Sequence, residues 1–325
     1  MKTTVRRRTL LASLPGLLAA PAAWAQATFP TQPVTLIVPF AAGGGTDLVA
    51  RVIAQHMEST LGQPVLVDNK AGANGNIAGA FVAKASPDGH VVLYNTSSMV
   101  ISPAVYRSLG YDALKDLAPV GLSASIPTGM LVAPQLPVCT LSEFIAYAKA
   151  NPGKLAYGSS GSGNINHMTA LQFAQALGID AVHAPYKGSA PATIDLSAGR
   201  IHFMIDTVNN VSGFVKDSKL KLLATATPRR LAMYPDVPTF TESGVPHFES
   251  GAWSGMMVPA RTPRAVIERL NGALLAALQS AQVRQKLDAQ GTQALGSSPA
   301  DYAKFLQAET ARWAQVARTA KLEPQ

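Results

Sequence analysis

The sequence predicts an α/β fold with two domains, each a mostly parallel sheet flanked by helices. Strand-like apolar runs alternate with helical patterns through most of the chain, which is typical of parallel strands joined by crossover helices. About 300 residues remain once an N-terminal leader is set aside, more than one hydrophobic core usually serves. Proline-rich punctuation at 126–127 and at 245–254 indicates two places where the chain crosses between domains.

Residues 1–25 are predicted to be a cleaved signal peptide. Four basic residues lie within the first eight positions, an apolar segment follows, and the leader ends with the A-x-A pattern Ala23-Trp24-Ala25. The apolar segment is shorter than the ~20 residues of a membrane span and is interrupted by prolines, which favours cleavage over anchoring. The pair Arg7-Arg8 also resembles a twin-arginine signal. The mature chain is therefore expected to be soluble and outside the cytoplasm.

Charge and cysteine content exclude several classes of protein. Four of the 27 Lys and Arg residues lie in the leader, so 23 remain against 19 Asp and Glu, a net charge of +4. This mild excess forms no basic cluster, so a nucleic-acid partner is not expected. Cys139 is the only cysteine, so there is no disulfide framework. We interpret Cys139 as a small buried apolar side chain rather than a nucleophile.

The first strand and the loop that follows it indicate an anion site. A β-branched apolar run spans 34–40, and the glycines 43–45 follow directly. Thr46 or Asp47 then occupies the expected N-cap position of a helix over 47–61. A strand, a glycine loop and a capped helix start present backbone N–H groups and a positive helix end to an anion.

Two familiar glycine motifs do not match this loop. A phosphate-binding P-loop requires a lysine after the last glycine, and none is present. A dinucleotide fingerprint requires a small third residue where Leu48 stands, although Asp68 lies near the distance expected of a ribose-binding acid. A tight turn without a ligand is the remaining alternative, and a backbone anion site is favoured.

The later elements follow the same alternation. Further strands are expected at 65–67, 91–95, 129–133, 155–158, 181–185, 201–206 and 220–225. Further helices are expected at 77–84, 141–151, 164–177 and 191–198, and three more fill the tail at 263–277, 281–290 and 299–321. We assign 27–127 plus 251–325 to domain 1 and 128–250 to domain 2. Two crossings make a hinged arrangement, with a ligand between the carboxyl ends of the strands.

The segment 157–167 is a second anion-binding candidate. Glycines and the hydroxyls of Ser159, Ser160 and Ser162 lie between a strand end and a helix, and they can hold a carboxylate without a fixed cation. The alternative is a serine hydrolase that uses Ser160 and His167. The G-x-S-x-G elbow is absent, so a structural or binding role of His167 is favoured over a general base.

Few other residues suggest chemistry. Asp206 ends an expected strand, where it either accepts a hydrogen bond from a ligand amine or hydroxyl or caps a turn. Trp253 lies at an expected crossing, and we interpret it as core or hinge packing. Histidines show no metal-ligand spacing and no acid pair suggests acid–base catalysis, so no metal, cofactor or catalytic residue is expected.

Several motifs together resemble the Bug (TctC-like) solute-binding proteins, the periplasmic receptors of tripartite tricarboxylate transporters (TTT). They lie, in the family's order and spacing, at 39–47 with Arg51, 85–89, 157–167, 186–192 with Asp195, Leu196 and Gly199, 234–239 with Glu242 and Gly244, and 259–263. The chain departs from the family's commoner Asn-Arg-Pro-Gly at 69–72, where it reads Asn-Lys-Ala-Gly. The glycine turn is kept there, so no effect on the ligand site is expected.

The resemblance implies a periplasmic-binding-protein (Venus flytrap) fold and a non-enzymatic receptor for a small carboxylate. The carboxylate would be a di- or tricarboxylate, an amino acid or an aromatic acid, passed to the permease subunits by a monomeric receptor in the periplasm. Family residues carried over to this chain place one side of the carboxylate site at Phe40, Ala42, Gly43, Gly44, Gly45, Thr46 and Asp47. They place the other side at Ser159, Ser160, Gly161, Ser162, Gly163 and His167, with Asn95, Thr96, Ser97 and Asp206 against the rest of the ligand.

Asp47 is expected to cap its helix and shape the loop rather than touch an anion, because like charges repel. Two other functions stay open from the sequence: an exported serine hydrolase, and a ligand-sensing partner of a signalling system.

Overall fold

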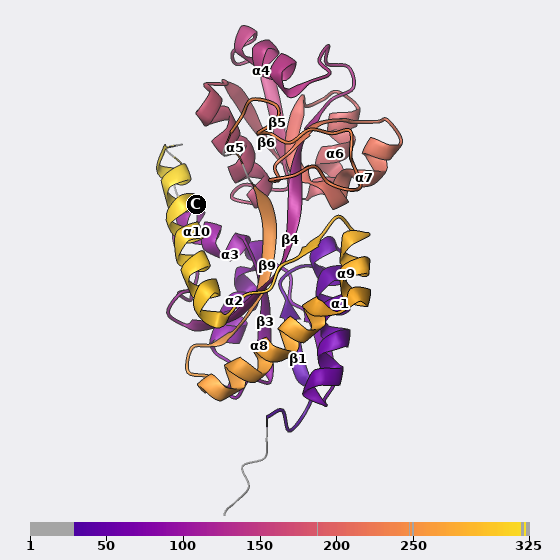
Figure 1. Ribbon diagram of the computed structural model, residues 1–325. Coiled ribbons are helices and arrows are strands. Elements are labelled where there is room, and N and C mark those ends of the chain that lie inside the picture. Colours follow the sequence, from indigo (N-terminus) through magenta and orange to yellow (C-terminus); the bar gives the residue numbers. More distant parts are fainter. Residues whose placement is uncertain (1–28, 187, 247, 249, 320–321, 323–325) are drawn as a thin grey trace, which may run out of the picture.

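The computed structural model describes residues 29–319 and 322, without 187, 247 and 249 (Figure 1). The predicted signal peptide and Lys187 lie outside the described residues. The strands are β1 (Val34–Val38), β2 (Val65–Asn69), β3 (Val91–Thr96), β4 (Leu117–Val132), β5 (Leu155–Ser159), β6 (Ala181–Pro185), β7 (Phe203–Thr207), β8 (Lys221–Thr225), β9 (Gly251–Pro259) and β10 (Gln293–Ala294). The helices are α1 (Gly45–Leu61), α2 (Asn76–Ala83), α3 (Ser98–Val105), α4 (Leu141–Ala150), α5 (Ile165–Leu177), α6 (Ser189–Ser197), α7 (Val208–Lys216), α8 (Arg264–Gln279), α9 (Ala281–Asp288) and α10 (Pro299–Thr319), with a 3₁₀ turn η1 (Ala73–Gly75).

The strands form one mixed sheet in the order β2-β1-β3-β9-β4-β7-β5-β6, with β8 and β10 each paired to β4. The outer strands are parallel: β1 pairs with β2 and β3, and β5 pairs with β6 and β7. The central strands β4 and β9 run antiparallel to each other and to their other neighbours. The α/β class is confirmed, and the expected parallel pairing is found towards both ends of the sheet.

Strand β4 joins two lobes of the molecule (Figure 1). Its residues 117–127 pair with β9, and its residues 128–132 pair with β7 and β8. We call the part around β1, β2, β3 and β9 the first lobe, and the part around β5, β6, β7 and β8 the second lobe. The assignment of 27–127 plus 251–325 and of 128–250 to separate domains stays a prediction.

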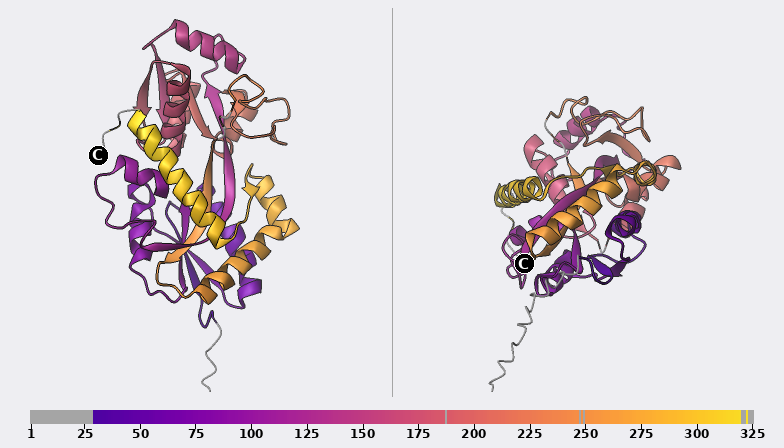
Figure 2. Two further views of the ribbon diagram at one scale, coloured as in Figure 1. Left: turned by 60° about the vertical axis from the view of Figure 1, so that its left-hand side comes forward. Right: turned by 60° about the horizontal axis from the view of Figure 1, so that its bottom comes forward.

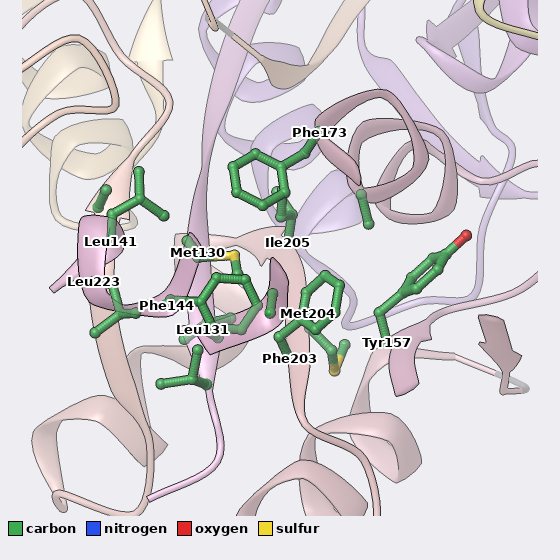
Figure 3. Close-up of a cluster of buried hydrophobic side chains, with 14 of the residues drawn as sticks. Met130, Leu131, Leu141, Phe144, Tyr157, Phe173, Phe203, Met204, Ile205 and Leu223 are labelled. Carbon is green, nitrogen blue, oxygen red and sulfur yellow. The ribbon is translucent and has the colours of Figure 1, made fainter. Parts of the chain in front are cut away.

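Three cores stabilise the two lobes. Phe144, Phe173 and Phe203 belong to the core of the second lobe, and the rings of Phe144 and Phe203 meet edge to face at 5.0 Å (Figure 3). In the first lobe, one core packs α1, α8 and α9 against the sheet. Another packs α2, α3 and α10 and also includes Ile165 and Met168 of α5, so it reaches the second lobe. Helix α10 extends from the first lobe to contact α5 of the second lobe (Figure 2).

Several elements differ from the expectation, each for a local reason. The strand expected at 129–133 is the end of β4, which is 16 residues long. The earlier part of β4, and β9, were not expected as strands. They lie in or near the segments whose prolines and glycines indicated chain crossings between domains. Helices α3 and α7 were not expected, because α3 contains Pro103 and α7 contains two asparagines and a glycine, which are poor helix formers.

Cys139 is exposed, so the expectation of a buried apolar side chain was wrong. It lies directly before α4, where Thr140 and Glu143 form a capping box. The Glu143 carboxylate also accepts a hydrogen bond from the Cys139 N–H, at 2.6 Å. Position 139 is therefore part of a surface helix start rather than of the core.

Candidate functional site

A cleft of about 290 Å³ opens between the two lobes, where the outer strands end and their helices begin. Within the described part of the chain, the first residues of five helices line it. They are Gly44, Gly45 and Thr46 at α1; Ser97 and Ser98 at α3; Asn164, Ile165 and Asn166 at α5; Gly188 and Ser189 at α6; and Thr207, Asn209 and Asn210 at α7. Phe40, Thr96, Ser160, Trp253 and Ser254 are also in the lining, with the apolar residues Val49, Ile126 and Ala252.

The electrostatics of this cleft come from backbone rather than from charged side chains. A helix N-terminus carries about half a positive charge, because its first N–H groups have no partner in the helix. The N-caps of α1 and α6 are glycines, and the N-cap side chains of α3 and α7 make no capping hydrogen bond. Every described residue of the lining has an uncharged side chain. The cleft therefore attracts an anion through neutral hydrogen-bond donors.

Asp47 stabilises the loop after β1 without lining the cleft. Its carboxylate is 2% exposed and accepts hydrogen bonds of 2.9 Å from the Gly43 N–H, from Arg51 Nε and from Asn69 Nδ2. Burial raises the pKa of Asp47, but the bonds from Arg51, Gly43 and Asn69 outweigh burial and hold it below 3.8. The N-cap of α1 is Gly44, so the expected cap at Thr46 or Asp47 was wrong.

The loop after β5 and the start of α5 contribute side chains to two different cavities. Ser160 faces the cleft and donates a hydrogen bond of 3.3 Å to Asn166 Oδ1. His167 lines a separate cavity, and its Nδ1 accepts a hydrogen bond of 3.0 Å from the Gly163 N–H. Because Ser160 and His167 open to different cavities and have different partners, they do not form the pair that a serine hydrolase needs.

Asp206 lies beneath the cleft and is fully buried. Its Oδ1 accepts hydrogen bonds from the Thr207 N–H at 2.6 Å and from Asn210 Nδ2 at 3.3 Å. Burial raises the pKa of Asp206 above 3.8. Its Oδ2 has no hydrogen-bond partner within 3.5 Å among the described residues, and the same holds for Asn166 Nδ2 and Asn209 Oδ1 beside the cleft. The side chains of Ser189 and Asn166 are still close enough to offset part of the rise in the Asp206 pKa. Buried polar atoms without partners are uncommon, and here they surround a cavity.

The structure brings part of the predicted site together. Phe40, Gly44, Gly45, Thr46, Thr96, Ser97 and Ser160 line the cleft. Ala42, Gly43, Asp47 and Gly161 belong to the same loops without lining it, and Asn95, Ser159 and Asp206 are buried outside its lining. Ser162, Gly163 and His167 line the second cavity. The ligand contacts of all these residues stay predictions.

Other cleft residues were not expected from the sequence. Asn209 and Asn210 follow β7, and Gly188 and Ser189 follow β6. The rule that ligands bind at the carboxyl ends of parallel strands could have found both pairs. Trp253 was expected in the core or hinge, and it does belong to the core that packs α2, α3 and α10. It is 5% exposed, lines the cleft and donates a hydrogen bond of 3.1 Å to Glu309 of α10.

The described residues contain neither a cluster suited to a metal ion nor a helix suited to crossing a membrane. No group of three or more His, Cys, Asp or Glu side chains there could hold a metal ion. In the same part of the chain, no helix has the length and apolar character needed to cross a bilayer.

Comparison with known proteins places the chain in a family. The model of the tripartite tricarboxylate transporter family receptor (TctC) matches residues 49–322. The chain belongs to this receptor family. It is 35% identical to the protein BugT of Bordetella pertussis over 293 residues, which cover 90% of each chain.

Solved structures of the same type are similar over nearly the whole chain. The R. palustris protein Rpa4515, solved with adipate, is 36% identical with a TM-score of 0.83, covering 91% of this chain and 100% of that one. MatC from Rhodopseudomonas palustris, solved with bound malate, is 35% identical with a TM-score of 0.78, covering 89% and 100%. The predicted periplasmic-binding-protein fold is thus confirmed.

Membership in the TctC family also settles the class of function. Its members are periplasmic solute-binding receptors that bind small carboxylates and work with transporter permeases, and they are not enzymes. The expectation of a Bug-type receptor is confirmed, and the serine-hydrolase alternative is not retained.

Proposed function

We propose that the mature chain captures a small carboxylate in the cleft between its lobes and delivers it to the membrane permease of a tripartite tricarboxylate transporter. The convergence of five helix N-termini on a cleft whose described lining carries no charged side chain supports this proposal most strongly. Such a cleft favours a negative charge without requiring an ion pair. Neutral donors also let a ligand leave as readily as a transport receptor needs, because no strong salt bridge must break.

One carboxylate group binds between the loop after β1 and the loop after β5 in this proposal. The donors are the N–H groups at Gly44, Gly45 and Thr46 on one side, and the Ser160 hydroxyl with the α5 N-terminus on the other. The relatives solved with adipate and malate support a ligand of this class. Bridging waters can complete the hydrogen bonds that the protein does not make directly.

The far end of the ligand lies towards α7. Asn209 and Asn210 line that side, and Asn210 links the cleft to the buried carboxyl group of Asp206. Of the two asparagines in the lining with an unpartnered atom, Asn209 offers an acceptor at Oδ1 and Asn166 offers a donor at Nδ2. This mixed set favours a ligand whose far end both donates and accepts, such as a hydroxyl, an amine or a second carboxylic group.

The proposed receptor works outside the cytoplasm and as a single chain. The chain is exported, residues 1–25 are removed, and the receptor acts as a monomer in the periplasm. The basic, then apolar leader with its A-x-A ending supports export. Permease recognition would follow closure of the lobes around the ligand, since β4 connects them as a hinge element.

A thermal-shift screen of the mature chain tests the proposal. After unfolding and refolding to remove any copurified ligand, the chain is mixed with adipate, malate, citrate, glutamate and benzoate. A carboxylate at 100-fold excess over its Kd should stabilise the fold by about 2.7 kcal/mol. The matched control is the neutral amide of the compound that binds. A stabilising effect of the amide equal to that of the acid, or no shift by any acid, would contradict the proposal.

A further inference from the structure

A second cavity of about 250 Å³ lies on the other side of the loop that carries Ser160. The loop presents Ser160 and Asn164 to the cleft, and it presents Ser162 and Gly163 to this cavity. The remaining lining is Val105, Tyr106, Tyr157, His167, Leu171, His183 and Leu322. The two cavities thus share one loop as a wall, and the groups behind the loop can control its shape.

Two histidines hold the two ends of this loop. At its start, His183 Nε2 and Ser159 Oγ share a hydrogen bond of 2.7 Å, and Ser159 Oγ also accepts one of 3.2 Å from the Gly161 N–H. At its end, His167 Nδ1 accepts the Gly163 N–H at 3.0 Å. Gly163 has a φ of +72°, a conformation that glycine adopts readily and other residues rarely do.

The two imidazole rings support each other. They stack with centroids 3.8 Å apart and planes 14° apart, and the Tyr157 ring stacks on His183 at 5.0 Å. His167 is 4% exposed. Burial lowers the pKa of His167 to about 3, with a contribution from His183, and burial lowers the pKa of His183 to about 4.

Both rings are therefore neutral near pH 7, and only a neutral Nδ1 can accept the Gly163 N–H. The other ionisable side chains that line this cavity, within the described residues, are Tyr106 and Tyr157.

We propose that His167 and His183 are positioning residues for the ligand carboxylate. They fix the 159–163 loop so that the Ser160 hydroxyl and the N-terminus of α5 face the cleft, and they do so without touching the ligand. This inference rests on the proposed function, and it places His167 behind the ligand loop instead of in contact with the ligand.

The test compares variants of the mature chain by two measurements: the Kd of the carboxylate selected in the screen, and the hydrogen-exchange rate of the Gly163 amide by NMR. His167→Leu removes the acceptor and should weaken binding at least tenfold while speeding Gly163 exchange at least tenfold. His167→Gln offers a side-chain oxygen to the Gly163 N–H, so it should recover part of both effects.

His202→Leu is the matched control, because His202 Nδ1 also accepts a backbone N–H, that of Ala156, at 2.9 Å. That bond lies at the start of β5, away from the ligand loop, so the control should leave the Kd and the Gly163 exchange rate unchanged. Wild-type values of both in His167→Leu, or equal losses in the two Leu variants, would overturn the inference.

The wild-type chain supplies a test that needs no substitution and no ligand. In an acid titration, the Gly163 amide resonance should shift together with protonation of the His167 ring, near pH 3. A Gly163 resonance that does not follow the His167 ring would overturn the inference even if His167→Leu failed to fold. Absence of carboxylate binding by the wild type would refute the proposed function, while the Gly163 measurements would still decide the role of His167.

Discussion

Substitution of Gly45 by alanine tests the geometry of the cleft. Gly45 is the first residue of α1, and a Cβ atom at this position would lie 2.6 Å from Nδ2 of Asn209 in the second lobe. Ordinary van der Waals contact is about 3.5 Å, so Asn209 must move by about 1 Å. Gly45 is not among the glycines with positive φ, so the methyl group acts on Asn209 and not on the backbone.

The expected cost is the loss of one hydrogen bond between Asn209 and the ligand. A neutral hydrogen bond contributes about 0.5–1.5 kcal/mol, so Gly45→Ala should weaken carboxylate binding by up to about tenfold. The free energy of unfolding should not fall, because alanine favours the helix. Calorimetric titration gives the Kd, and urea denaturation gives the stability.

Gly272→Ala is the matched control for this experiment. Gly272 lies within α8, and a Cβ atom there meets open space. The control should therefore stabilise the fold by about 0.5–1 kcal/mol and leave the Kd unchanged. Carboxylate binding by Gly45→Ala as tight as that of the wild type would refute the assignment of Gly45 and Asn209 to the ligand site.

Three further substitutions test single hydrogen-bonding groups by urea denaturation. Asp47→Ala leaves the Gly43 N–H without its acceptor and should lower the free energy of unfolding at pH 7 by about 1–3 kcal/mol. Because the folded-state pKa of Asp47 is lowered, this difference should shrink as the pH falls below about 4. Asp206→Asn should be more stable than the wild type at pH 7 and similar at pH 3, since the folded-state pKa of Asp206 is raised and its charge opposes folding above about pH 4. Glu309→Ala removes the acceptor of the Trp253 and Trp313 indole N–H groups and should lower the free energy of unfolding by about 2 kcal/mol.

Specific outcomes would contradict each of these three. A constant difference between wild type and Asp47→Ala from pH 7 to pH 3 would exclude a lowered pKa. Asp206→Asn less stable than the wild type at pH 7 would mean that the carboxylate is needed in its charged form. Glu309→Gln keeps one acceptor oxygen and serves as the control for Glu309→Ala, so equal losses in both would point to the charge rather than to the indole bonds.

The sequence predicted the parts of the fold that depend on local periodicity. Strand β1 with its glycine loop, and β5 with the serine-rich loop, were expected close to their observed positions, because an apolar run followed by glycine and a helical pattern is a local signal. Strand β9 was not expected, since its glycines and proline resemble those of a connection. Strand β9 pairs with β3 and β4, whose residues lie more than a hundred positions earlier in the sequence, so a local pattern does not reveal the pairing.

The same limit applies to the candidate site. Gly44, Gly45 and Ser160 were nominated from motifs, and they line the cleft. Which side of a loop a residue faces depends on the groups behind it, and a motif does not contain them. His167 was nominated for the ligand site, yet its contacts with Gly163 and His183 place it in the second cavity. Asn209 was missed because α7 has weak helical propensity, so no helix was expected after the strand that Asp206 ends.

The central claim is that neutral donors at helix N-termini bind a carboxylate in this cleft. The most direct measurement is a calorimetric titration of the refolded mature chain with the acid that gives the largest thermal shift, beside its neutral amide. We expect saturable binding of the acid with one site per chain and at least a hundredfold weaker binding of the amide. Equal affinity for acid and amide would contradict the claim, because the negative charge of the ligand would then contribute nothing to binding at the helix N-termini.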